Sequence, residues 1–159
     1  MKPLAIELDG VLGDTRPLWN DWLEDAARRF RSIAPLDPAR LPADRVEAAE
    51  ELDAWADRGV GDWRALLGRF AEDRAPVYLR PDAEVSAVLR RLAAQGNRLG
   101  VFTDAPEALA RIAVSQLGAE RRIEALEAGE GALERLLERL GSDAMVVRKR
   151  SELPLQFAS

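Results

Sequence analysis

Cysteine and histidine are both absent from this chain of 159 residues. Without cysteine the protein cannot form disulfides, use a thiolate nucleophile or hold a metal through sulfur. Without histidine it cannot build a Ser-His-Asp triad or use an imidazole as a general base. Any chemistry must therefore run on carboxylates, Lys, Arg, hydroxyls and backbone amides.

Long apolar runs and an excess of positive charge are missing as well. No run approaches the length of a membrane span, and the N-terminus enters a strand pattern rather than a signal peptide, which predicts a cytoplasmic protein. The formal net charge is -5, which argues against nucleic acid or an anionic membrane as the main partner. Apolar residues make up 47% of the chain and charged residues 32%, a balance typical of one globular domain of this length.

The apolar pattern predicts strands that alternate with helices. Short apolar runs that end in turn residues predict strands over residues 4–8, 98–103 and 144–147, and a weak strand or a helix end over residues 122–125. Helical spacing predicts helices over residues 18–33, 43–56, 63–72, 82–94, 106–117 and 132–140, and residues 76–81 are predicted to form an extended connector. Such alternation is typical of a three-layer, Rossmann-like α/β fold with a parallel sheet.

The stretch between the first two strands is too long for a simple crossover. We therefore predict a helical insertion over residues 16–78, with the α/β core formed by residues 1–15 and 79–159. All four tryptophans fall within the insertion, and we expect them to pack as its core, with stacking against a ligand as the alternative: Trp19, Trp22, Trp55 and Trp63.

Two segments together resemble a known family. Residues 4–15, LAIELDGVLGDT, are similar to the first motif of the haloacid dehalogenase (HAD) superfamily, a hydrophobic strand followed by Asp-x-Asp-Gly-(Thr/Val)-Leu-x-Asp. Residues 100–104, GVFTD, resemble its second motif, a strand that ends in Thr or Ser. The helical insertion after the first motif resembles the cap of phosphoglycolate-phosphatase-like members. The resemblance covers essentially the whole chain and implies a HAD-like fold.

The resemblance also implies roles for individual residues. Glu7 stands at the position of the nucleophile, which attacks phosphorus in active members, and Asp9 at that of the acid/base. Gly10, Thr103 and Asp104 lie where the family binds phosphate or another ligand. Active members hold Mg²⁺ between the first carboxylate, a backbone carbonyl and an acid after the fourth strand.

Three positions depart from that family pattern. Glu7 replaces the usual Asp, which moves the carboxylate outward by about one bond, a displacement on the order of 1 Å that can cost about a hundredfold in rate. The family's third-motif Lys should fall near residues 129–131, where the sequence is Gly-Glu-Gly. Lys149 stands where a metal-binding acid is expected, and Arg148 replaces the preceding glycine.

These departures suggest that Arg148 or Lys149 supplies an internal cation beside Glu7 and Asp9. A guanidinium or ammonium there would neutralise acids that are costly to leave unpaired in a cleft. We then expect no cofactor and no metal, and Glu7 and Asp9 would be the ligands of any metal that did bind. Structural alternatives stay open, because Asp9 and Thr103-Asp104 also suit turns and helix starts, and residues 148–150 suit a solvated surface run.

Three functions remain open at this stage. The first is a catalytically impaired or inactive phosphatase-like protein that binds a small phosphorylated molecule or a protein partner. The alternative is a weak or altered Mg²⁺-dependent phosphomonoester hydrolase that retains Asp9 and Thr103. The third is a subunit role in which the insertion forms a homodimer or a complex with another protein.

Overall fold

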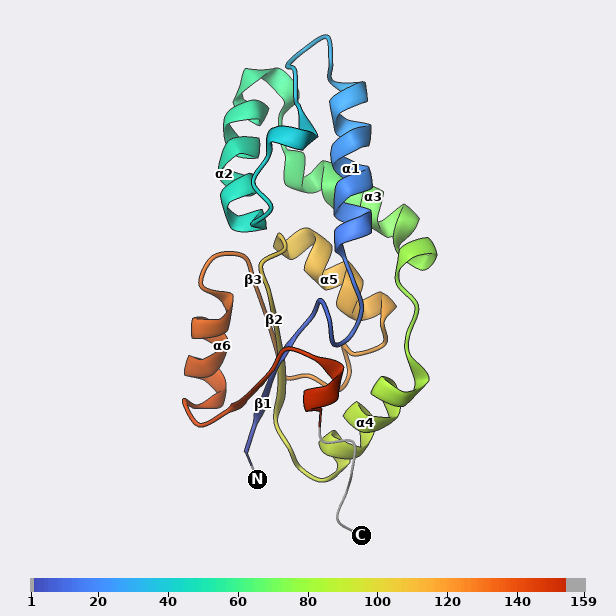
Figure 1. The fold of residues 1–159 in the computed structure, drawn as a ribbon, viewed down its shortest axis with the longest axis vertical. Coiled ribbons are helices and arrows are strands. Elements are labelled where there is room, and N and C mark those ends of the chain that lie inside the picture. The colour runs from blue at the N-terminus through green and yellow to red at the C-terminus, as the bar shows by residue number, and fades with distance from the viewer. Residues whose placement is uncertain (1, 154–159) are drawn as a thin grey trace.

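The computed structural model describes residues 2–153 of the chain. Four parallel strands form one sheet in the order β3-β2-β1-β4 (Figure 1). The strands are β1 (Leu4–Glu7), β2 (Leu99–Thr103), β3 (Ala125–Ala128) and β4 (Met145–Val147). Parallel pairing brings the C-terminal ends of the strands to one edge of the sheet, so the segments that follow them lie together.

Helices cover both faces of this sheet. Because side chains alternate along a strand, Leu4 and Ile6 pack against α4 (Ala83–Ala94) and α5 (Glu107–Gln116), whereas Ala5 packs toward α6 (Ala132–Leu140). The two groups of helices stand on opposite sides of the strands (Figure 1). A Cβ added at Gly100 would lie 2.5 Å from a methyl of Leu136, so α6 approaches β2 more closely than a larger residue allows. The predicted three-layer α/β fold is confirmed.

The segment between β1 and α4 folds into helices of its own. These are α1 (Arg16–Arg29), α2 (Arg45–Trp55), which continues into a π-helical turn (Ala56–Val60), and α3 (Trp63–Tyr78), with a 3-10 turn (Pro38–Arg40) before α2. All four tryptophans are buried in the cluster that these helices share. The ring centroids of Trp22 lie 5.6 Å from Trp19 and 5.7 Å from Trp63. The predicted packing role of the tryptophans is confirmed.

The insertion is joined to the core through α3 and α5. Ala105 and Leu109, at the start of α5, belong to the buried cluster of the insertion, and Gly68 on α3 faces Ala108. The hydroxyl of Tyr78, at the end of α3, donates a hydrogen bond to Asp21 on α1. The contacts between α3 and α5 hold the insertion above the C-terminal edge of the sheet, and the Tyr78–Asp21 bond joins α3 to α1 within it (Figure 1).

Two predicted elements are wrong in position. The predicted connector over residues 76–81 begins inside α3, because the helix continues through Pro76 while Ala71 and Ala75 stay buried one turn apart. The third strand occupies Ala125–Ala128 rather than residues 122–125, where it pairs with Gly100–Thr103 of β2. Only Ala125 of this edge strand is fully buried, so its sequence carries little apolar signal.

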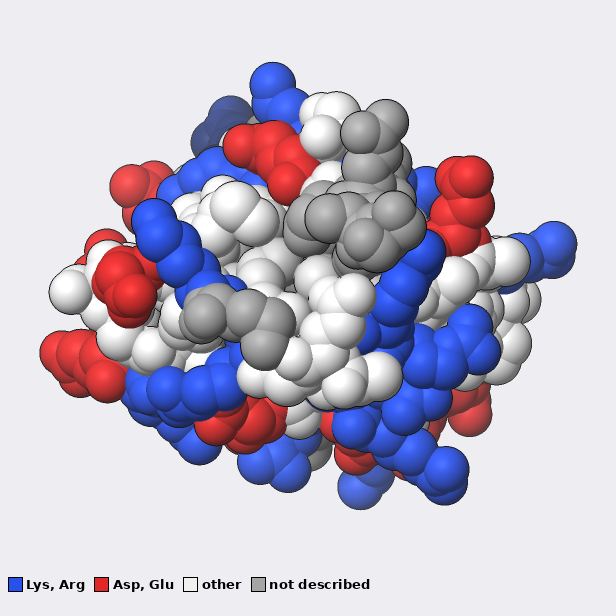
Figure 2. Space-filling model, turned by 90° about the horizontal axis from the view of Figure 1, so that it is seen from below, with Lys and Arg blue, Asp and Glu red and all other residues white. Residues whose placement is uncertain are grey.

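The surface of the described residues carries both signs of charge. Figure 2 views the end of the molecule opposite the insertion and shows acidic and basic side chains interspersed around an uncharged central area. Among residues 2–153, no helix has both the length and the apolar composition that crossing a bilayer requires.

Candidate functional site

The C-terminal edge of the sheet gathers most of the residues that the motifs predict. Glu7 ends β1, Thr103 ends β2 and Arg148 directly follows β4. Glu7 pairs in register with Phe102, and β4 lies on the other side of β1. Ligands of open parallel sheets bind at this edge, so the fold puts these side chains where a site is expected.

Arg148 forms an ion pair with Glu7. The Arg148 Nη1 donates to Glu7 Oε2 at 2.9 Å, and the guanidinium lies over the ring of Phe102, 5.3 Å from its centroid. Burial raises the pKa of the Glu7 carboxyl above its ordinary value of 4.5, and the charge of Arg148 only partly offsets this. The backbone N–H of Arg148 donates to the Glu152 carboxylate at 3.0 Å, which fixes the start of the turn.

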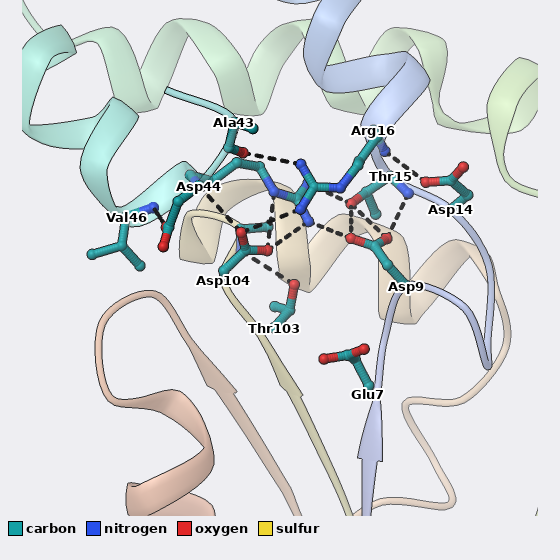
Figure 3. Close-up of polar contacts among 12 residues, drawn as sticks. Glu7, Asp9, Asp14, Thr15, Arg16, Ala43, Asp44, Val46, Thr103 and Asp104 are labelled. Carbon is teal, nitrogen blue, oxygen red and sulfur yellow. Dashed lines mark hydrogen bonds and ion pairs between the residues drawn. The ribbon is translucent and has the colours of Figure 1, made fainter. Parts of the chain in front are cut away.

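Asp9 faces away from Glu7, toward the insertion. Its carboxylate accepts hydrogen bonds from the backbone N–H of Thr15 at 2.7 Å and from the Thr15 hydroxyl at 2.8 Å. It also accepts one from Arg45. Glu7 lies outside this network (Figure 3), so the two motif carboxylates have separate sets of partners.

Arg45, the first residue of α2, connects the insertion to the core. Its side chain is fully buried, and its Nη1 donates to the hydroxyl of Thr15 at 2.7 Å. Its Nε and Nη2 donate to Asp104 Oδ1 at 3.1 and 2.8 Å, and its backbone N–H donates to Asp104 Oδ2 at 3.2 Å. One guanidinium therefore links the loops that follow β1 and β2, and its acceptors Asp9, Thr15 and Asp104 are labelled in Figure 3.

Asp104 takes part in this network as a charged group. Burial opposes its ionisation, but the hydrogen bonds and the charge of Arg45 outweigh burial and hold the pKa of Asp104 below its ordinary value of 3.8. Arg16 adds a second ion pair at 3.4 Å and donates to the carbonyl of Ala43 at 3.1 Å. Two arginines thus balance the charges of Asp9 and Asp104.

Gly10 lets the loop after β1 pass close to the loop after β4. Its φ is +95°, and a Cβ at this position would lie 3.2 Å from the carbonyl oxygen of Arg148. Arg150 joins the same two loops, because its Nε donates to the carbonyl of Val11 at 2.9 Å and its Nη1 pairs with Asp82 at 3.1 Å. The segment that carries Asp9 is therefore held from several sides.

Thr103 and Lys149 differ in their surroundings. The Thr103 hydroxyl is buried and accepts a hydrogen bond from the N–H of Ala105 at 3.2 Å, a bond that also suits the helix-start role considered for the sequence. Lys149 is exposed, and within residues 2–153 it forms no ion pair. Of the two cations predicted beside the motif acids, the structure brings Arg148 to Glu7 and leaves Lys149 outside.

The donor set at this edge does not fit Mg²⁺. Carboxylate oxygens are the ligands that Mg²⁺ prefers, and Glu7 and Asp9 are of that type. However, Glu7 is paired with Arg148 and Asp9 with Arg45. In the described part of the chain, no three Asp, Glu, His or Cys side chains converge into a metal-binding group.

A cleft of about 320 Å³ lies beside Asp104, between α2 and the loops that follow β2 and β3. Val46, Ala49 and Pro106 contribute apolar surface to it. Gly129 and Glu130, in the segment where the family's third-motif Lys is expected, also line it. Of the predicted site residues, Asp104 lines this cleft, whereas Glu7, Asp9 and Arg148 do not.

Sequence reasoning missed four residues of this site: Thr15, Arg16, Arg45 and Arg150. Arg45 makes its ion pairs with residues 36 and 59 positions away, so no local pattern marks it. Thr15 ends the first-motif segment without an assigned role, and Arg16 was predicted only as the first residue of the insertion. Arg150 belongs to the basic run of residues 148–150, for which a solvated surface was one interpretation.

The chain is similar in sequence to a known phosphatase. No protein-family model matches the chain. It is 31% identical to a phosphoglycolate phosphatase of Rhodospirillum rubrum over 168 residues, which cover 98% of this chain and 64% of that protein. The chain thus spans somewhat less than two thirds of the length of this relative.

Solved structures share the fold at low sequence identity. A HAD phosphatase from Thermococcus onnurineus matches with a TM-score of 0.57 at 18% identity, covering 93% of this chain and 77% of that chain. CbbY from Rhodobacter sphaeroides, solved in complex with phosphate, matches with a TM-score of 0.55 at 18% identity, covering 92% and 76%. The chain has the α/β fold of these HAD-like structures, and its sequence is similar to that of a phosphoglycolate phosphatase.

Proposed function

We propose that this protein is a catalytically inactive relative of the HAD-type phosphatases that acts by binding a small phosphorylated molecule or a protein partner. The observation that carries the proposal is the pairing of both motif carboxylates with arginine. Glu7 is bonded to Arg148 at 2.9 Å, and Asp9 is bonded to the buried Arg45.

Each pairing opposes one chemical task. A nucleophilic carboxylate needs a free oxygen aimed at phosphorus, whereas one Glu7 oxygen is held by Arg148 and the side chain is one methylene longer than aspartate. A general acid/base has to carry a proton to and from the reacting group. Asp9 accepts hydrogen bonds from Thr15 and Arg45, so its oxygens are committed to the junction with the insertion.

The charge arrangement supports binding without turnover. A phosphatase of this type needs a cation to bring an anionic nucleophile and an anionic phosphate together, and the donors at this edge do not fit Mg²⁺. The cleft beside Asp104 offers space for a ligand. Phosphate is the ligand of the CbbY structure, which favours a phosphorylated molecule over other small ligands for this chain.

Hydrolysis of p-nitrophenyl phosphate by the purified chain tests the proposal. We expect no release of nitrophenol above that of an Asp9→Asn variant, with Mg²⁺ or with EDTA. We also expect Glu7→Asp to remain inactive, because a restored nucleophile still lacks a metal site. Magnesium-dependent hydrolysis that Asp9→Asn abolishes would contradict the proposal.

Magnesium-dependent hydrolysis that Asp9→Asn abolishes would instead favour a weak Mg²⁺-dependent phosphomonoester hydrolase. The position of Asp9 after β1 and of Thr103 at the end of β2 is the observation that keeps this second candidate open. A gain of activity in Glu7→Asp alone would also support it, because the metal site would then have to be intact.

A further inference from the structure

Arg148 has hydrogen-bonding capacity that the folded chain does not use. A guanidinium carries five N–H donors, and among residues 2–153 the Arg148 side chain donates only to Glu7. The side chain is 52% exposed, in contrast to the fully buried side chain of Arg45. The half-exposed side chain therefore keeps donors at the C-terminal edge of the sheet that no residue among 2–153 accepts.

The chain fixes this guanidinium in place. Phe102 lies beneath it at 5.3 Å, and Glu7 holds one of its nitrogens. Both partners belong to neighbouring strands at the centre of the sheet. The backbone N–H of Arg148 is also anchored to Glu152. A group held in this way loses little freedom when it binds a ligand, which favours affinity.

The surrounding charges permit an anion to approach. Asp9 and Asp104 are each paired with Arg45, and Asp104 is also paired with Arg16. Glu7 is paired with Arg148 itself at 2.9 Å. No carboxylate of this group is left with an uncompensated charge to repel the ligand.

We propose that Arg148, backed by Glu7 and Phe102, binds the phosphate group of a phosphate monoester without any divalent cation. The guanidinium fork matches phosphate oxygens through two parallel hydrogen bonds. Arg148 then stands as a built-in counter-ion, which agrees with the poor fit of the donor set to Mg²⁺. The proposal rests on the proposed binding function, since it names the ligand class and the residue that recognises it.

Isothermal titration of inorganic phosphate into the full chain tests this site. We expect the same dissociation constant, within a factor of two, in buffer with EDTA and in buffer with Mg²⁺. Arg148→Met should weaken binding at least tenfold. The matched control is Arg90→Met, which removes an exposed arginine of α4 and should leave the dissociation constant unchanged. Arg148→Lys keeps the charge without the planar fork and should fall between Arg148→Met and the unchanged chain.

Three results would overturn the proposal. They are binding that appears only with Mg²⁺, binding that Arg148→Met and Arg148→Lys leave unchanged, and no binding of phosphate up to about 10 mM, a concentration well above ordinary metabolite affinities. Circular dichroism shows whether Arg148→Met folds. If it does not fold, the dissociation constant of Arg148→Lys tests the proposal instead. Inorganic phosphate is not turned over, so this titration can fail or succeed independently of the p-nitrophenyl phosphate assay.

Discussion

Replacing Arg45 by methionine should lower the free energy of unfolding by about 3–5 kcal/mol, the usual cost of removing one partner from a buried ion pair. Methionine keeps most of the apolar stem of the side chain, so the loss reports the guanidinium rather than a cavity. Arg45 is fully buried and bonded to Asp9, Asp104 and Thr15. Its removal leaves two carboxylates without their shared cation.

Urea unfolding followed by circular dichroism measures this change. With a slope of about 2 kcal/mol per molar urea, the midpoint should fall by about 2 M, and the melting temperature should fall by about 10 °C for a chain of this size. The matched control is Arg64→Met. Its pair with Asp53 at 2.8 Å has half-exposed partners, so a loss of less than about 1 kcal/mol is expected.

A double-variant cycle tests the cause. Asp104→Asn should cost less in the Arg45→Met background than in the unchanged chain, because it then removes a carboxylate that has lost its main partner. A loss of under about 1 kcal/mol for Arg45→Met, or simple additivity with Asp104→Asn, would refute the reasoning. The insertion would then be held by its apolar contacts with α5 and not by this ion pair.

Four further substitutions test the electrostatics and the loop geometry. Glu7→Gln should raise the free energy of unfolding more at pH 7 than at pH 4. The folded-state pKa of Glu7 lies above 4.5, so the ionised carboxylate lowers stability once the pH rises through that pKa. An equal effect of the substitution at both pH values in urea titrations would contradict this. Asp104→Asn should destabilise at pH 7, and its effect should shrink as pH falls from 3.8 through the lowered pKa of Asp104; a destabilisation that stays undiminished as the pH is lowered below 3.8 would count against the ion pair. Gly10→Ala should cost about 1–3 kcal/mol, because φ is +95° and the new Cβ would press on the carbonyl of Arg148. Gly68→Ala, inside α3 with ordinary 3.6 Å contact to Ala108, should stabilise by about 0.5–1 kcal/mol, and equal effects for the two glycines would refute the strain argument.

The sequence was sufficient to predict the sheet and the edge that carries the site. Apolar runs in β1 and β2 are buried on both faces, so their pattern marks them directly, and parallel pairing then brings Glu7 and Thr103 to one edge. The predicted position of the edge strand β3 was three residues too early, because all but the first residue of this strand are only partly buried. Burial, not strand geometry, produces the signal that sequence reasoning detects.

The choice between Arg148 and Lys149 could not be made from the sequence. Successive side chains of an extended segment point to opposite sides. If β4 ended one residue earlier or later, Arg148 and Lys149 would exchange sides. Because β4 ends at Val147, which is buried, Arg148 reaches Glu7 and Lys149 lies at the surface. The sequence predicted a cation at this place but not which residue supplies it.

The burial of Arg45 could not be predicted from the sequence for a different reason. Arginine is almost never fully buried unless it is paired, and a helix rich in Glu and Asp suggests a solvent-facing surface. Its partners Asp9 and Asp104 lie 36 and 59 residues away, so the burial of Arg45 depends on how the insertion sits on the core. No helical period or local motif carries that information.

The central claim is that guanidinium groups, and not a metal ion, neutralise the carboxylates at the edge of this sheet. A crystal structure grown with Mg²⁺ and phosphate tests it most directly. We expect Arg148 in contact with Glu7, phosphate on the free side of that guanidinium, and no metal between Glu7 and Asp9. A magnesium ion coordinated by Glu7, with Arg148 turned away, would contradict it.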